Sequence, residues 1–203
     1  MADARDLGRI CERLKDEITQ EVTDKLPRKV GIIAVNHFKQ NFRDSGFRDG
    51  GLHAWKRTKR QDSNSSDSRY SPLTSSRDHL MHSVQSHTGV GEVTIENNVP
   101  YAAIHNEGGT ITSHPNITKK MRGFAWHMAY SLAGISDSGK LPKDLPDEAQ
   151  KWKALALTKK TKANVTAHIP QRKFIGNSKE LNEKIGKEIN ETINKIKDGI
   201  SNL

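Results

Sequence analysis

The feature that most constrains the fold is a long apolar stripe near the C-terminus. Asn177 and Glu180 have the spacing of a capping box, which predicts that a helix begins there. Apolar residues then recur at steps of four and three, which places them on one face of that helix. They are Leu181, Ile185, Ile189, Ile193, Ile196 and Ile200. Such a face has to be covered, either by the protein's own core or by a partner helix.

The N-terminal segment carries a second stripe of the same kind, which predicts an amphipathic helix over 4–26 with Asp3 as its N-cap. Helical periodicity continues after Pro27 to about Asp44, because proline fits the first turn of a helix. Two arrangements stay open, a helical pair or one long kinked helix. The stripe consists of Leu7, Ile10, Leu14, Ile18 and Val22.

Between these ends the pattern is mixed. Alternation predicts a strand over 91–98, and further extended segments are expected at 110–114 and around 165–169. We therefore expect an α+β fold, in which a small antiparallel sheet is flanked by the N-terminal helices and the long C-terminal helix. Shorter helices are predicted over 75–87, 100–107, 117–132 and 147–155.

Residues 45–72 differ from the rest because they are rich in turns and serine and have little to bury, which predicts a mobile loop. A length of 203 residues suits a single domain spanning 1–203. Only 33% of the residues are hydrophobic, so the core is thin for this length. Two explanations fit this low hydrophobic content: parts of the chain are polar loops, or some surfaces are completed by partner subunits. The first explanation is the commoner one.

Charge points to anionic partners, since 33 Lys and Arg against 24 Asp and Glu give a net charge of +9. The best local candidate for nucleic-acid contact is Trp55 with the cations around it, because cations contact phosphates and aromatic rings stack on bases. The competing interpretation, a solvated loop, is favoured by the even spread of charge along the chain. The cations are Lys56, Arg57, Lys59 and Arg60.

No motif for a metal or cofactor is present. Cys11 is the single cysteine and lies among apolar residues, which predicts a buried thiol and excludes an internal disulfide. His79 and His82 could share a metal on a helix, but no cysteine is nearby and the sequence has no H-E-x-x-H motif, so we expect none. No cofactor is expected. No segment has the length of a membrane span or the pattern of a secretory signal, so we expect a cytoplasmic setting away from membranes.

The segment "PYAAIHNEGG" at 100–109 resembles an active site at first sight. His105 and Glu107 could form an acid–base pair, but residues two apart on a helix do not face each other. No nucleophile or second placed carboxylate supports a reaction. A structural turn is the better interpretation, with Gly108 and Gly109 reversing the chain through positive φ angles.

The segment "IPQRKFIGNS" at 169–178 looks like a docking element before the last helix. Pro170 fixes the backbone, and Arg172 is a planar donor of hydrogen bonds. Phe174 and Ile175 are a hydrophobic anchor. Such a unit positions the C-terminal helix against the sheet, and it could also present Arg172 to a neighbour.

Together the two segments resemble the phage virion morphogenesis family, the Mu-type tail-completion proteins. The family pattern is Tyr-Ala-x-Ile-His-x-x-Gly, followed later by Ile-Pro-x-Arg-x-Phe-Ile-Gly-x-Ser before a terminal helix. The resemblance spans most of 75–203, while 45–72 has no counterpart and Lys173 stands where a second proline is expected. The matching residues are Tyr101, Ala102, Ile104, His105, Gly108 and Gly109, then Ile169, Pro170, Arg172, Phe174, Ile175, Gly176 and Ser178.

The resemblance implies a non-enzymatic structural protein of a tailed phage or phage-derived particle, assembled in the host bacterial cytoplasm. It implies a ring of subunits at the neck that completes the tail and enables head–tail joining, with tail-tube and connector proteins as partners. A DNA-binding accessory protein with a basic surface is the alternative. The residues expected at interfaces or in structural motifs are Tyr101, Ile104, His105, Glu107, Gly108, Gly109, Pro170, Arg172, Phe174 and Ile175.

Overall fold

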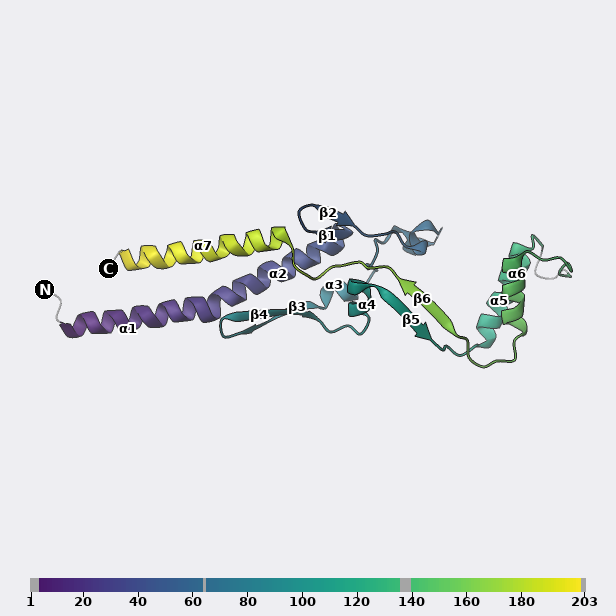
Figure 1. Cartoon of the computed structure of the whole chain (residues 1–203), viewed down its shortest axis with the longest axis horizontal. Helices are drawn as coiled ribbons and strands as arrows, with labels where there is room; N and C mark the ends of the chain where they lie inside the picture. Colours follow the sequence, from purple (N-terminus) through teal and green to yellow (C-terminus); the bar gives the residue numbers. More distant parts are fainter. Residues whose placement is uncertain (1–3, 64, 136–139, 202–203) are drawn as a thin grey trace. The chain divides into compact units, whose positions relative to one another are not determined.

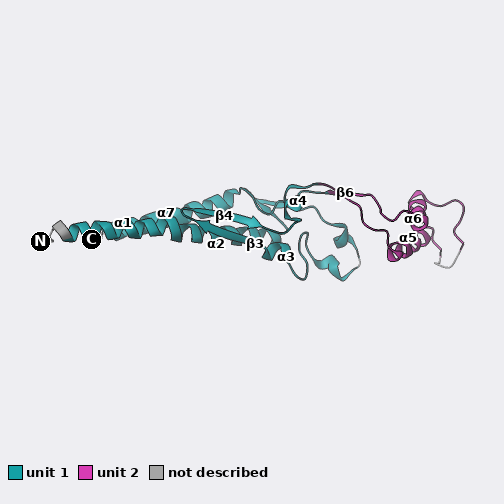
Figure 2. Cartoon of the chain, turned by 90° about the horizontal axis from the view of Figure 1, so that it is seen from below, with its two compact units in different colours: residues 1–109, 169–203 teal, residues 110–168 magenta. Residues whose placement is uncertain are grey.

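The computed structural model of the chain describes residues 4–63, 65–135 and 140–201, and Figure 1 shows its helices and strands. The chain divides into two compact units, which Figure 2 colours separately: unit 1 is residues 1–109 and 169–203, and unit 2 is residues 110–168. The α+β class is confirmed, with the strands of the described residues arranged as three two-stranded sheets. The single domain expected from the sequence stays a prediction.

The N-terminal part of unit 1 is helical from Ala4 to Arg43. Helix α1 (Ala4–Gln20) passes through a short π-helical segment, η1 (Glu21–Lys25), into α2 (Leu26–Arg43). Pro27 lies in the first turn of α2 and offers no N–H group to the preceding helical turn, and the Thr23 carbonyl accepts a hydrogen bond from the Gly91 backbone at 2.9 Å instead. Of the two arrangements left open by the sequence, a single long helical run is the one observed. Asp3, the expected N-cap, lies outside the described residues.

The C-terminal helix α7 (Lys179–Ser201) runs back along α2 (Figure 1). Its N-cap is Ser178, whose hydroxyl accepts a hydrogen bond from the Leu181 backbone at 3.2 Å. The cap predicted at Asn177 is therefore wrong by one residue. Serine and asparagine both cap helices, so residue type alone does not distinguish Ser178 from Asn177. In the structure the Asn177 Oδ1 accepts a hydrogen bond from the Asn182 Nδ2 at 2.9 Å instead.

The segment 45–72 is more structured than its composition indicated. It begins with an antiparallel hairpin, whose turn is held by Glu180, because this carboxylate accepts hydrogen bonds from the backbone of Gly50 and Gly51 at 2.9 Å each. Mobility of the segment stays a prediction. Its elements are β1 (Gly46–Arg48), β2 (Leu52–Ala54) and the 3₁₀ turns η2 (Lys59–Asp62) and η3 (Ser66–Arg69).

The helix predicted over 75–87 is wrong in its second half. Only α3 (His79–His82) is helical, and β3 (Val84–Gly89) follows it. β3 pairs with β4 (Glu92–Asn97), the strand that alternation predicted, from Val84 opposite Asn97 to Gly89 opposite Glu92. Pairing with β4 overrides the helical preference of the isolated segment, since strand stability depends on partners distant in sequence.

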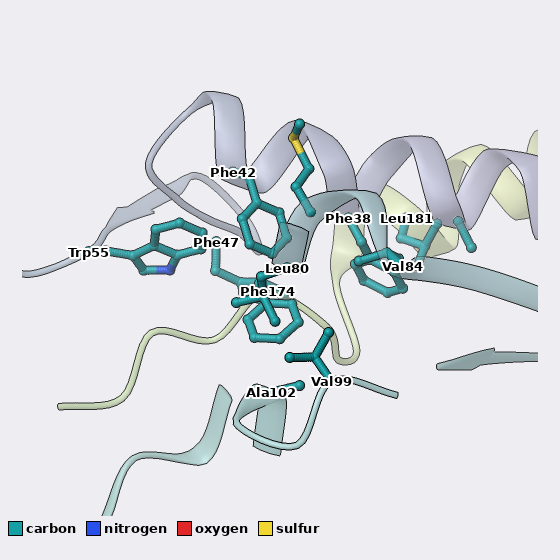
Figure 3. Packing of buried hydrophobic residues seen from close by; sticks show 12 residues of the cluster. Phe38, Phe42, Phe47, Trp55, Leu80, Val84, Val99, Ala102, Phe174 and Leu181 are labelled. Carbon is teal, nitrogen blue, oxygen red and sulfur yellow. The ribbon is translucent and has the colours of Figure 1, made fainter. Parts of the chain in front are cut away.

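The core of unit 1 joins α2, α3, the two hairpins and the start of α7 (Figure 3). Its centre is aromatic: the Phe42 ring lies 5.0 Å from that of Phe174 and 5.6 Å from that of Trp55. The other buried members include Ala34, Phe38, Phe47, Leu80, Met81, Val84, Val99, Ala102 and Leu181.

Unit 2 begins and ends at the strand pair β5 (Gly109–Ser113) and β6 (Val165–Ile169), which confirms both extended predictions. Between them, α5 (Lys119–Leu132) packs on α6 (Asp147–Leu157), and both helices were predicted. The packing uses small residues, since Ala125, Ala129 and Ala149 are fully buried. The Phe124 and Trp152 rings meet edge-on at 5.7 Å.

Candidate interface

The two sequence motifs meet in unit 1. The segment 100–109 contains helix α4 (Ala102–Glu107), and the last residues of α4 bind the chain that leads into α7. The His105 carbonyl accepts a hydrogen bond from the Arg172 backbone at 2.8 Å. The Asn106 Oδ1 accepts from the backbone of Phe174 at 2.9 Å and of Ile175 at 3.0 Å, and its Nδ2 donates to the Ile175 carbonyl at 3.1 Å. One asparagine side chain thus fixes the motif that anchors the C-terminal helix.

Glycine is required at a close approach between the two segments. Gly108 has a φ of +73°, and a Cβ atom there would lie 2.8 Å from the Gln171 nitrogen. Gly109 has a φ of +142°. Both angles lie in the region that favours glycine, which confirms the predicted chain reversal.

Phe174 is the hydrophobic anchor that the sequence indicated, since only 1% of it is exposed and it packs against Phe42. Its carbonyl accepts a hydrogen bond from the Asn41 Nδ2 at 3.1 Å, and the Asn41 Oδ1 accepts from the Arg48 backbone at 3.3 Å. Asn41 therefore joins α2, the β1–β2 hairpin and the motif. Ile175 is half-buried against the same core, and Pro170 is exposed.

Arg172 is directed inward. Only 6% of it is exposed, and its Nε and Nη2 donate to the Lys56 carbonyl at 3.1 and 3.0 Å. The guanidinium group braces the 45–72 segment, and only a small part of its surface stays accessible. Burial lowers its pKa from the usual value.

The expectation that Trp55 belongs to an exposed loop is wrong. Only 8% of it is exposed, its Nε1 donates to the Lys173 carbonyl at 2.9 Å, and its ring packs edge-on against Phe42. A ring held in this way has no free face for a base. Sequence reasoning missed this because the surrounding residues are polar, while the partners of Trp55 lie far away in the chain.

The cations beside Trp55 divide into two groups. Lys56, Arg57 and Lys59 are exposed. Arg60 is half-buried, and its Nη2 donates to the carbonyls of Ser71 at 2.9 Å and Thr74 at 3.1 Å, with a longer bond to Tyr70. Three of the four cations are therefore exposed, with Arg57 paired to the Asp62 carboxylate at 3.2 Å, and the fourth closes the 60–74 loop.

His105 and Glu107 do different things in the structure. The His105 ring lies 5.9 Å from that of Tyr101, and its buried Nδ1 has no hydrogen-bond partner among the described residues. Burial first, and then the charge of Arg172, lower the pKa of His105. The Glu107 carboxylate accepts a hydrogen bond from the Asn106 Nδ2 at 2.6 Å and is exposed. This arrangement holds a turn, and the carboxylate does not orient the imidazole.

A second candidate surface lies between α1 and α7, where a groove of about 480 Å³ is open to solvent. Its apolar members come from both predicted stripes, and charged residues of both signs border it. Ile200, 48% exposed, is among them, and Leu7 and Ile193 nearby on the same helices are also exposed. Cys11 is exposed as well, so the buried thiol expected from the sequence is wrong. The apolar residues are Leu14, Ile18, Ile196 and Ile200, and the charged ones are Arg13, Glu17, Glu21, Lys25 and Lys195.

The match to known proteins covers nearly the whole chain. A model of the phage virion morphogenesis family matches residues 2–194 of the 203. The chain belongs to the phage virion morphogenesis family. No curated protein and no solved structure matches it.

Family membership supports a structural or morphogenetic role in a phage, with other virion proteins as partners. In the part of the chain that the structure describes, no helix has the length and apolar character needed to cross a membrane. His79 and His82 both lie on α3, and no group of three or more potential metal ligands occurs among residues 4–63, 65–135 and 140–201.

Proposed function

We propose that this protein is a non-enzymatic component of a tailed phage or phage-derived particle that completes the tail and enables head–tail joining as a ring of subunits. Membership of the phage virion morphogenesis family over residues 2–194 is the observation that carries this proposal. Its partners would be tail-tube and connector proteins, and it would be assembled into the virion in the bacterial cytoplasm.

The groove between α1 and α7 is our candidate for contact between subunits. A stripe of aliphatic residues exposed on a helix is typical of a surface covered by another helix. Because the charged border contains both signs, a second copy of the same groove would offer complementary charges, which suits association between identical chains. Covering this stripe would also explain how a chain with few hydrophobic residues forms a stable assembly.

The test is the oligomeric state of the full-length protein, measured by sedimentation and by negative-stain imaging. We expect closed rings, and we expect Ile200→Ser to weaken them because Ile200 lies in the groove. Ile32→Ser is the matched control, since Ile32 is an isoleucine on α2 with 61% of its surface exposed and lies outside the groove. A strictly monomeric wild-type protein would contradict the ring.

The alternative, a DNA-binding accessory role, draws support from the exposed Lys56, Arg57 and Lys59. Binding through these cations should weaken steeply as salt is raised, because counterions are released from the phosphates. Replacing all three by Gln should then reduce both the affinity and the salt dependence. Absence of binding at low salt would remove this alternative.

A further inference from the structure

A cavity of about 340 Å³ lies in unit 1 beside the two motif segments. Its walls come from α3, α4, the 58–75 segment and Arg172. The cavity is thus formed where the elements of the two motifs meet, and the interactions described so far leave it unused.

The cavity has an unbalanced charge. Arg60, Arg172, His79 and His105 line it, and none of its described lining residues is Asp or Glu. The hydrogen bonds of both guanidinium groups go to neutral carbonyls, of Lys56 for Arg172 and of residues 70–74 for Arg60. Two cations partly withdrawn from water, without a paired carboxylate, favour an anion in the space between them.

Unpartnered atoms point to the same conclusion. The Nε of Arg60 and the Nδ1 of His105 are buried, and neither has a hydrogen-bond partner among the described residues. Both belong to residues that line the cavity. Buried polar atoms are rarely left unpaired in proteins, so two such atoms on residues that line one cavity leave hydrogen-bonding capacity there for a polar ligand. The lowered pKa of His105 keeps its ring neutral near pH 7, which leaves the charge of that ligand to the arginines.

We propose that this cavity binds one anionic group, the carboxylate of an acidic side chain presented by another virion protein. A planar guanidinium matches a carboxylate in shape and charge. Leu80 and Tyr101 supply apolar wall for the methylene groups of such a side chain. A phosphodiester fits less well, because a continuous strand needs an open channel. The identity of the partner rests on the proposed structural function, whereas anion binding by the cavity does not.

The anion site is tested with acetate as the probe. Acetate is added to the full-length protein at constant ionic strength, with chloride as the reference salt, and the ring signals of His79 and His105 are followed by NMR. We expect both signals to shift saturably with acetate and not with chloride. A shift that stays linear, or that chloride reproduces, would overturn the site without the need for any variant.

Two variants of Arg60 separate charge from structure. Arg60→Lys and Arg60→Gln both remove the guanidinium group that donates to the carbonyls of residues 70–74 and both keep an N–H donor, but only the lysine keeps the positive charge. We expect the acetate affinity to fall at least tenfold in the Gln variant and clearly less in the Lys variant. Equal affinity in the Gln variant and the wild type would overturn the role of Arg60.

Competition tests whether the cavity prefers a carboxylate or a phosphodiester. N-acetylglutamate should displace acetate from the cavity, and a single-stranded oligonucleotide should not. Displacement by the oligonucleotide would overturn the assignment to a carboxylate. If the Gln variant fails to bind acetate but still supports particle assembly, the partner assignment is wrong, while the structural function proposed above stands.

Discussion

Asn106→Ala is the substitution that tests the link between the two motifs most sharply. The side chain that it removes accepts from the backbone of Phe174 and Ile175 and donates to the Ile175 carbonyl. Alanine keeps the helical backbone of α4 but leaves these three backbone groups without their partner. The chain that leads into α7 should therefore be held to α4 less firmly, with the bond from the Arg172 backbone to the His105 carbonyl still in place.

The expected cost follows from these bonds. A hydrogen bond contributes roughly 0.5–1.5 kcal/mol net, and an unsatisfied buried group costs about 1–3 kcal/mol. Asn106 is half-buried and water can reach part of the site, so we expect the lower range, about 2–4 kcal/mol for the three contacts together. Asn182→Ala is the matched control, because Asn182 is exposed and its side chain makes a single bond to Asn177. We expect it to cost less than about 0.5 kcal/mol.

The assay is urea unfolding followed by tryptophan fluorescence. Trp126→Phe and Trp152→Phe in the background leave Trp55 as the single tryptophan, and Trp55 reports on the core of unit 1. Circular dichroism measured in parallel checks that the helices form. If Asn106→Ala and Asn182→Ala unfold at the same urea concentration, the clamp formed by Asn106 does not hold the motif.

Three further predictions concern the core, the turn and the buried His37. Phe174→Ala should cost about 3–5 kcal/mol of unfolding free energy, because it empties the centre of an aromatic core. Gly108→Ala should cost about 1–3 kcal/mol through its positive φ and its contact with residue 171, whereas Gly123→Ala, in helix α5 with open space around it, should stabilise by up to ~1 kcal/mol. His37 is 2% exposed, and burial, followed by the charge of Lys184, lowers its pKa. As the pH falls, this histidine is protonated in the unfolded chain before it is protonated in the folded one. Stability should therefore fall as the pH drops below about 6.5. His37→Leu should flatten that dependence and leave the slope that comes from other titratable groups such as His105, whose pKa burial also lowers, as urea unfolding at several pH values would measure.

Each of these expectations has an outcome that contradicts it. A cost below about 1 kcal/mol for Phe174→Ala would mean that the core of unit 1 is not packed as described. If Gly108→Ala and Gly123→Ala had equal unfolding free energies, the positive φ and the close approach at Gly108 would not require glycine there. An unchanged pH dependence in His37→Leu would assign the acid sensitivity to other groups.

Periodic patterns predicted the long elements well, because a helix or strand with one apolar face carries its signal locally. The stripe from Leu181 to Ile200 predicted α7, and alternation in residues 91–98 predicted β4. The helix predicted over 75–87 failed because Val84 and its neighbours are fixed by pairing with β4, which no local pattern reports. The prediction that Trp55 lies in an exposed loop failed for the same reason, since its partners Phe42 and Lys173 are distant in sequence.

The candidate site was predicted in part. Both motifs were recognised, and Phe174 and Gly108 have the roles expected of them. The two asparagines that join the parts, Asn41 and Asn106, were missed. Asparagine is disfavoured inside helices, so an unexplained one near a motif is a signal that could have been used. The inward direction of Arg172 depends on the Lys56 carbonyl, which only the folded chain brings near.

The central claim is that this member of the phage virion morphogenesis family acts structurally, in joining heads to tails. Electron microscopy of particles made without the protein, and with it restored, tests the claim most directly. We expect separate heads and tails in its absence, joined particles when the wild type or Ile32→Ser is supplied, and few joined particles with Ile200→Ser. Intact, joined particles in the absence of the protein would contradict the claim.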